Sequence, residues 1–321
     1  MNWKKINLYI LIAFGISWIT FAVLNFLPIH FSTVTQTFII ACLYMPGPAI
    51  ATLIIQKLIY KQSLKEYGWS FDSKAIKWIF FVPLIYLALI LLTLSAIGLL
   101  GNTSAIPQFG QLDFSEPGFN VRFTEMLETA GAIGTTKLPT IPPLLIFFLS
   151  IIGAVIAGAT INLPFMFGEE FGWRGLLYRE TQKLGFLRSS VFIGIVWGLW
   201  HLPLIVLSGL NYPEHPYSGI LMMCLFTVAL SPVFSYVRFK TKSILGPCML
   251  HGMINATGTL FLLYVANFHE LYSSFAGWAG IIASSIIVAG IYIFDKKFIK
   301  EFGELTQENT LVEEQTGREF V

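Results

Sequence analysis

The chain has 321 residues, of which 55% are hydrophobic and only 12% are Asp, Glu, Lys or Arg. Soluble proteins carry about 25% charged residues, so this chain lacks the charge to cover a soluble domain of its size. The composition excludes a soluble enzyme, a nucleic-acid-binding protein and a disordered chain. The net charge of +2 identifies no partner by itself. We therefore expect a polytopic membrane protein.

Eight stretches are long and apolar enough to cross a bilayer as helices, which need about 20 apolar residues each. In chain order they are Ile6–Leu27, Val34–Leu58, Ile76–Leu100, Leu144–Phe167, Ser190–Leu207, Gly219–Val237, Ile244–Val265 and Trp278–Phe294. The first is too long for the apolar part of a signal peptide and lacks a small-residue cleavage site, so it is predicted to stay as a span. The sequence predicts an all-α bundle of eight transmembrane helices.

Basic residues gather at alternate ends of these predicted spans. Of the 20 Lys and Arg residues, only Arg122 and Lys137 fall in a loop on the opposite side from the others. Cytoplasmic loops carry most of the Lys and Arg in membrane proteins, so both termini are predicted to be cytoplasmic. The pattern indicates an integral protein of a bacterial cytoplasmic membrane.

The predicted spans divide the chain into three parts. Residues 1–142 hold three spans and a long outer loop, Gly101–Pro143, in which Val121–Ile133 is predicted to be either a surface helix or a plain loop. Residues 143–265 hold the next four spans. Residues 266–321 hold the last span and a charged tail that is predicted to be cytoplasmic.

Three polar clusters interrupt the apolar spans, where an ionisable side chain costs about 2.5–3.5 kcal/mol. They contain Glu169, Glu170 and Arg174 at the inner end of the fourth span, His201 in the fifth, and His251 with Asn255 in the seventh. Residues four apart share one face of a helix, so Arg174 can pair with Glu170, and the seventh span presents both of its polar residues on one side. We expect the clusters to meet in one polar cavity that opens toward the cytoplasm.

These residue types suit the hydrolysis of a peptide bond. Glu169 is predicted to act as general base on a water molecule that His201 helps to hold. His251 and Asn255 would donate hydrogen bonds to the oxyanion that develops on the peptide carbonyl. Two adjacent carboxylates cannot both ionise cheaply at low dielectric, so Arg174 is predicted to keep one of them charged.

A zinc ion is the alternative activator of the water molecule. Glu169, His201 and His251 are the candidate ligands, because Zn²⁺ prefers imidazole and carboxylate groups and makes bound water more acidic. The H-E-x-x-H motif of the zincin proteases is absent from the sequence. Residue types alone leave both mechanisms open.

Each cluster taken singly also has a purely structural interpretation. A membrane histidine often bonds to a neighbouring helix, and a glutamate pair with an arginine can be an interfacial ion pair. Trp173, Trp197 and Trp200 are predicted to pack or to lie at the membrane interface rather than to act in catalysis. The convergence of the three clusters favours a functional site.

The same residues resemble the motifs of the CPBP intramembrane proteases, formerly called the Abi family, which include the CAAX prenyl endopeptidases and bacteriocin-processing enzymes. Three family motifs occur in order between Phe165 and Asn255. They are E-E-x-x-x-R at Glu169, Glu170 and Arg174, F-x-x-x-H at His201 with Trp197 in place of Phe, and H-x-x-x-N at His251 and Asn255.

This resemblance implies an intramembrane endopeptidase in a bundle of eight helices, with residues 143–265 as its catalytic core. It implies that Glu169 activates water with His201, that Glu170 and Arg174 support the site, and that the third motif stabilises the oxyanion. Family members are described both as metalloproteases and as glutamate-dependent enzymes, so zinc remains open. The predicted partners are the lipid bilayer and a membrane-associated peptide or protein, such as a peptide pheromone or a bacteriocin leader.

Two functions without proteolysis remain as alternatives. One is a non-catalytic scaffold of the cell envelope or of bacteriocin immunity. The other is an ion-coupled transporter that uses Glu and His as a proton relay, which ranks lower because the sequence has no inverted repeat of its two halves. The complete set of motifs favours the protease, since binding alone does not require such a cavity.

Overall fold

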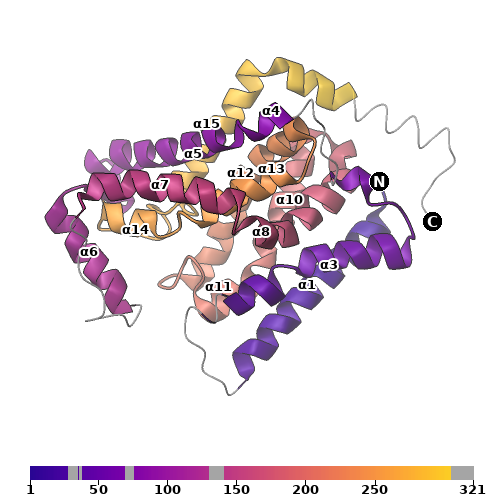
Figure 1. The fold of residues 1–321 in the computed structure, drawn as a ribbon, viewed down its shortest axis with the longest axis horizontal. Helices are drawn as coiled ribbons and strands as arrows, with labels where there is room; N and C mark the ends of the chain where they lie inside the picture. Colours follow the sequence, from indigo (N-terminus) through magenta and orange to yellow (C-terminus); the bar gives the residue numbers. More distant parts are fainter. Residues whose placement is uncertain (28–34, 36–37, 69–75, 130–140, 305–321) are drawn as a thin grey trace.

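The computed structural model describes residues 1–27, 35, 38–68, 76–129 and 141–304, which form a bundle of helices (Figure 1). Five segments are long and apolar enough to cross a membrane: Trp3–Phe26, Ile40–Ile59, Ile76–Asn102, Phe186–Ser208 and Pro216–Thr241. Two pairs of helices pass the same test together but bend between their members. These are Pro143–Ala159 with Leu163–Leu184, bent by 60°, and Trp278–Phe294 with Lys296–Glu304, bent by 82°. The predicted class, a polytopic helical membrane protein, is confirmed.

The elements follow one another with short connections, and η denotes short 3-10 or π-helical turns. The first half contains α1 (Trp3–Phe26), η1 (Ile40–Tyr44), α3 (Gly47–Leu53), η2 (Ile54–Ile59), η3 (Lys65–Tyr67), α4 (Ile76–Ile79), α5 (Val82–Ile97), η4 (Gly98–Asn102), η5 (Pro107–Phe109), β1 (Gln111–Leu112) and α6 (Glu116–Thr129). The second half contains α7 (Pro143–Ala159), α8 (Leu163–Glu170), η6 (Phe171–Leu177), α9 (Tyr178–Thr181), η7 (Gln182–Leu184), α10 (Phe186–Trp200), α11 (Leu202–Ser208), α12 (Pro216–Thr241), α13 (Leu245–Asn255), α14 (Leu260–Tyr264), β2 (Val265–Ala266) and α15 (Trp278–Phe294).

The predicted seventh span, Ile244–Val265, is not one continuous helix. Helix α13 ends at Asn255 after 11 residues, a length of about 16 Å that covers about half of a bilayer core. The sequence Ala-Thr-Gly-Thr at Ala256–Thr259 interrupts the apolar pattern, and the chain then forms α14 and the strand β2, which pairs antiparallel with β1. The described chain contains five helices that are long and apolar enough to span a membrane, or up to seven with each bent pair counted as one span, whereas the sequence predicts eight.

The predicted fourth span bends at Thr160–Asn162, and the reason is local. Pro164 occupies the first turn of α8, where its missing N–H is tolerated, but it cannot continue a helix that began earlier. The side chain of Asn162 donates from Nδ2 to the backbone oxygen of Gly252 at 2.9 Å. The start of α8 is thus attached to α13, and the carboxylates at the end of α8 are directed back into the bundle.

The long outer loop contains helix α6, which begins five residues before the predicted Val121–Ile133 segment. Arg122 ties this helix to the bundle, because its Nη1 lies 3.0 Å from Asp113 Oδ2 and its Nε donates to the backbone oxygen of Leu263 at 2.8 Å. Part of the predicted segment, and the tail from residue 305 onward, lie outside the described residues. The cytoplasmic location of both termini stays a prediction.

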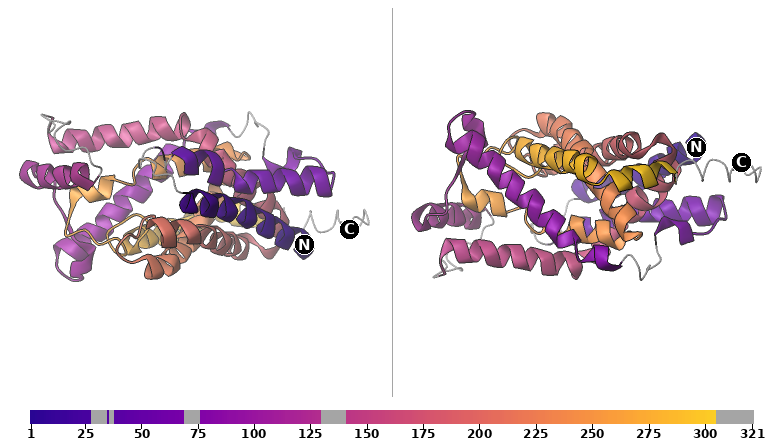
Figure 2. Two further views of the ribbon diagram at one scale, coloured as in Figure 1. Left: turned by 90° about the horizontal axis from the view of Figure 1, so that it is seen from below. Right: turned by 90° about the horizontal axis from the view of Figure 1, so that it is seen from above.

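Helix α12 lies beside α10 through the middle of the bundle, and α13 packs between α7, α8 and α12 (Figure 1). Figure 1 and Figure 2 show α7 running along the long dimension of the molecule, with α14 beside its first residues. The close approach of α7 to α13 depends on glycine. A Cβ atom built on Gly158 would lie 2.5 Å from the backbone nitrogen of Met253, and one on Gly252 would lie 2.9 Å from Gly158 Cα.

We expect Gly158→Ala to lower the free energy of unfolding by about 1–3 kcal/mol, because the added methyl group must push α13 away from α7. Gly153→Ala is the matched control on the same helix, since a Cβ there meets no atom within 4 Å. The control should be neutral or slightly stabilising, because Ala is a better helix former than Gly. Thermal unfolding of the two purified variants in detergent measures their stabilities. Equal unfolding midpoints for the two variants would contradict the close packing of α7 against α13.

Candidate active site

The three predicted polar clusters lie on neighbouring helices in the middle of the chain. Glu169 and Glu170 end α8, Arg174 follows in η6, His201 caps the end of α10, and His251 lies in α13. Helix α13 contacts α8 and α12, and α12 contacts α10 along its length. The elements that carry these five side chains therefore pack on one another, with α13 and η6 joining α8 to α12 and α10.

A buried ion pair forms the centre of this cluster. Glu170 and Arg174 are fully buried, and Arg174 Nη1 lies 3.2 Å from Glu170 Oε2. His251 Nδ1 donates to Glu170 Oε1 at 2.9 Å, because an ionised carboxylate can only accept. Arg174 Nη2 also donates to Ser231 Oγ on α12 at 3.3 Å. One carboxylate thus fixes both a guanidinium and an imidazole.

Aromatic rings replace water around the Arg174 guanidinium. Its central carbon lies 4.6 Å from the centroid of the Trp197 ring and 4.4 Å from that of Phe234. Cation–π contacts of this kind stabilise a desolvated guanidinium by about 2 kcal/mol. The backbone oxygen of Arg174 accepts from Arg238 Nε at 3.2 Å. The arginine is therefore held from both its side chain and its main chain.

Glu169 lies next to this ion pair but has a different partner. Its side chain is buried, and its Oε2 accepts a hydrogen bond from Trp197 Nε1 at 3.0 Å. The indole nitrogens of Trp173 and Trp200 are buried too, and in the described part of the chain neither has a hydrogen-bond partner. Their two rings pack edge to face, 5.9 Å apart. Buried donors without a protein partner usually bind water.

The half-buried side chain of His201 lies where α10 ends, since Pro203 follows in the first turn of α11. His201 Nδ1 bonds to the backbone oxygen of Trp197 at 2.9 Å. A carbonyl oxygen can only accept, so Nδ1 carries the proton, and Nε2 of the neutral ring has the free lone pair. The bond from His251 Nδ1 to Glu170 likewise places the proton of neutral His251 on Nδ1. Neutral His251 therefore accepts at Nε2 and donates from that atom only when it is protonated.

Asn255, the sixth predicted residue, lies at the edge of the cluster. It is exposed, and its Nδ2 contacts Met166 Sδ at 3.3 Å. Met166 precedes Glu170 by one helical turn, and Asn255 follows His251 by one turn. Helices α8 and α13 thus run antiparallel here, with Asn255 one turn from the ion pair.

Trp197 has a larger role than the packing predicted from sequence. It donates to Glu169, accepts from His201, covers the Arg174 guanidinium, and its ring lies 5.3 Å from that of His251, edge to face. The only sequence signal for this role was its position four residues before His201, where the resembling family has Phe. Ser231 and Phe234 of α12 were missed altogether, because they belong to no motif.

The zinc alternative receives no support from this arrangement. Throughout the described residues, no three His, Cys, Asp or Glu side chains are grouped so as to hold a metal ion. The three candidate ligands Glu169, His201 and His251 do not fit a zinc site as they stand.

Comparison with known proteins agrees with the motifs. Residues 139–257 match the family model of the Rce1-like type II CAAX prenyl endopeptidases. The CAAX prenyl protease 2 of Methanococcus maripaludis is 27% identical to this chain over 138 residues, which are 41% of this chain and 48% of the archaeal protein. The chain thus covers about half the length of that relative. The resemblance to a CAAX-type intramembrane protease family is confirmed, and all six predicted site residues fall within the matched segment.

Proposed function

Because the segment that carries the site matches the Rce1-like CAAX prenyl endopeptidases, we propose that this protein is an intramembrane endopeptidase. Its substrate would be a membrane-associated peptide or protein, cleaved at one peptide bond within a bacterial cytoplasmic membrane. The observation that carries the proposal is the pair of adjacent buried glutamates. Glu170 is neutralised by Arg174, whereas Glu169 accepts a hydrogen bond from the uncharged Trp197 indole. Glu169 is therefore the glutamate that is available for proton transfer.

In the proposed reaction Glu169 activates a water molecule. The water donates one hydrogen to the Glu169 carboxylate and the other to the Nε2 lone pair of His201, which orients its oxygen toward the substrate carbonyl. The Trp197 indole keeps Oε2 of Glu169 in place. As the water oxygen bonds to the carbonyl carbon, its proton moves to Glu169, and the carbonyl oxygen becomes an oxyanion.

The oxyanion requires hydrogen-bond donors, and the opposite helix supplies them. Protonated His251 would donate from Nε2, while its Nδ1 keeps its hydrogen bond to the Glu170 carboxylate. Asn255 would donate from its amide, which requires only that Nδ2 leave the weak contact with the Met166 sulfur. The tetrahedral intermediate then collapses, the C–N bond breaks, and Glu169 returns its proton to the leaving amine.

Peptide cleavage in a bilayer tests this function. The purified full chain would be reconstituted in vesicles with three peptides of one sequence context: a farnesylated Cys-a-a-X peptide, the same peptide without the farnesyl group, and a bilayer-anchored leader peptide. We expect at least one of them to be cut at a single bond, detected as two product masses. If the folded protein cuts none of them, or cuts them equally well after Glu169→Gln, the proposal is wrong.

Trp197→Phe is expected to lower kcat about tenfold with little change in KM, because Glu169 loses a charge-assisted hydrogen bond while the aromatic ring is kept. Trp18→Phe is the matched control. It also removes one indole hydrogen bond, from Trp18 Nε1 to the backbone oxygen of Trp200 at 3.0 Å, but that bond does not involve Glu169. Cleavage kinetics of both variants decide the point: an equal loss in the two would show that Trp197 acts through packing alone.

A further inference from the structure

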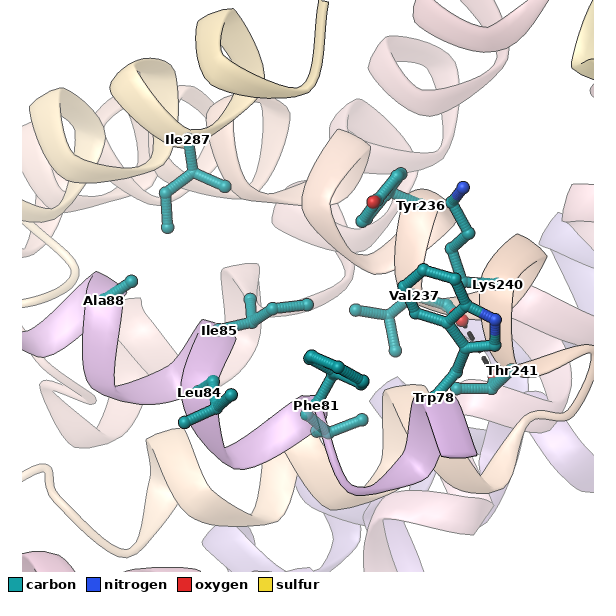
Figure 3. Close-up of a pocket in the computed structure, with 11 residues that line it drawn as sticks. Trp78, Phe81, Leu84, Ile85, Ala88, Tyr236, Val237, Lys240, Thr241 and Ile287 are labelled. Carbon is teal, nitrogen blue, oxygen red and sulfur yellow. Dashed lines mark hydrogen bonds between the residues drawn. The ribbon is translucent and has the colours of Figure 1, made fainter. Parts of the chain in front are cut away.

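An apolar groove lies between α4, α5, α12 and α15, and no part of the proposed reaction uses it (Figure 3). It encloses about 260 Å³. Apolar side chains make up most of its wall, with a lysine amine and a tyrosine hydroxyl at one end. Its lining consists of Trp78, Phe81, Val82, Leu84, Ile85, Ala88, Tyr236, Val237, Lys240, Thr241 and Ile287.

The groove is separate from the candidate active site, although both contact α12. Ser231 and Phe234 face Arg174, whereas Tyr236 and Lys240 face the groove (Figure 3). Because successive residues of a helix are rotated by about 100°, these two pairs lie on different sides of α12. A molecule in the groove would therefore not touch the site directly.

The length of the groove matches one leaflet of a membrane. Its wall on α4 and α5 runs from Trp78 to Ala88, a rise of about 15 Å, which is about half of the 30 Å hydrocarbon core. Both α5 and α15 belong to segments able to span a membrane, and they diverge toward the end that holds α4 (Figure 2). An apolar gap of this length between spanning helices fits a single acyl chain.

The end of the groove near α4 is polar and basic. Lys240 Nζ lies 2.6 Å from Asp295 Oδ2 and 4.9 Å from the centroid of the Trp78 ring. The Tyr236 hydroxyl donates to the same Asp295 oxygen at 2.9 Å. Trp and Tyr are typical of the membrane interface. This end therefore lies at the level of the lipid headgroups.

Charge at this end favours an anion. Lys77 precedes Trp78 on α4, Lys296 follows Asp295, and both lysines are exposed. Asp295 balances Lys240, so Lys77 and Lys296 add two positive charges among the described residues at this end. Basic pockets between membrane helices bind the phosphates of anionic lipid headgroups. The excess positive charge thus complements a phosphate at the entrance to an acyl-chain groove.

We propose that this groove binds one anionic glycerophospholipid. One acyl chain lies between α5 and α15 against Phe81, Ile85 and Ile287, and the phosphate is bound near Lys240 and Lys77. The lipid fills the gap where the two helices diverge and bridges them to α12. This assignment does not depend on the proposed protease activity.

Quenching of Trp78 by brominated lipid tests the proposal. The full chain would be placed in phosphatidylcholine nanodiscs that contain increasing fractions of phosphatidylglycerol or phosphatidylcholine with dibrominated acyl chains. The protein has 8 tryptophans, so the Trp78 signal is the difference between the parent and Trp78→Phe. We expect half-maximal quenching at an about fivefold lower mole fraction of the brominated phosphatidylglycerol.

Two sets of variants distinguish binding of the lipid headgroup from binding of its acyl chain. Lys77→Gln and Lys240→Gln should each reduce the preference for phosphatidylglycerol, and Lys77 is exposed, so its replacement leaves folding intact. Ala88→Phe should fill the groove and protect Trp78 from quenching, whereas Leu91→Phe, at a 60% exposed position on the same helix, should not. Any of three results would overturn the assignment. These are equal quenching by both lipids, no effect of Ala88→Phe on quenching, and displacement of the brominated lipid by a farnesylated peptide.

Discussion

Glu169→Gln is expected to lower the rate of peptide cleavage by about 10²–10⁴-fold, the usual contribution of a general base. The amide has nearly the shape of the carboxylate and can still accept the hydrogen bond from Trp197 through its oxygen, so the packing of α8 should be kept. It cannot take a proton from water. Cleavage of the peptide that the parent cuts, measured at matched concentrations of folded protein, gives the ratio of kcat values.

The matched control is Glu301→Gln, the same chemical change at a partly exposed carboxylate that forms an i,i+4 pair with Lys297 at 3.6 Å. Exposed pairs of this kind contribute little to stability, and this one is far from the site in sequence. The control should cleave as fast as the parent. Equal activity of Glu169→Gln and Glu301→Gln would remove Glu169 from the mechanism.

Arg174→Met is expected to give the largest loss of stability, about 3–5 kcal/mol, because it leaves the fully buried Glu170 carboxylate without its cation. The double variant Glu170→Gln/Arg174→Met removes both charges and should recover part of that loss. Thermal unfolding in detergent, or resistance to denaturing detergent, measures the three variants against the parent.

Lys300→Met is the matched control for this prediction. Lys300 and Glu304 also form an i,i+4 ion pair, with Nζ and Oε1 3.7 Å apart, but both side chains are exposed. Its loss should change the free energy of unfolding by less than about 0.5 kcal/mol. If Arg174→Met were no more destabilising than Lys300→Met, the buried pair would not hold α8, η6 and α13 together as described.

The helical membrane class was predictable because apolar length is a direct requirement of the bilayer. The same signal failed at Ile244–Val265, where apolar residues resume after Thr259 but helix α13 does not continue through them. There α14 and β2 pack against β1 and α6, contacts with a segment more than 100 residues earlier in the chain. Hydropathy cannot distinguish apolar residues buried in protein from those that face lipid.

Part of the site follows from helical spacing. The pair of Glu170 and Arg174 is four residues apart, and the structure forms it. The bond from His251 to Glu170 joins residues 81 apart in the chain, and the bond from Trp197 to Glu169 joins residues 28 apart. No local rule gives such partners. Without them the sequence could not indicate that His251 is tied to the ion pair or that an indole fixes Glu169.

In the proposed mechanism Glu169 activates water and does not itself attack the substrate. The most direct test is cleavage over many turnovers in water enriched in oxygen-18, followed by mass spectrometry of the peptide product and of the protein fragment that contains Glu169. We expect one oxygen-18 atom in the new carboxyl group of the product and none in Glu169. Oxygen-18 in the Glu169 carboxylate would show that Glu169 forms a covalent anhydride with the substrate, and would rule out its role as a general base on water.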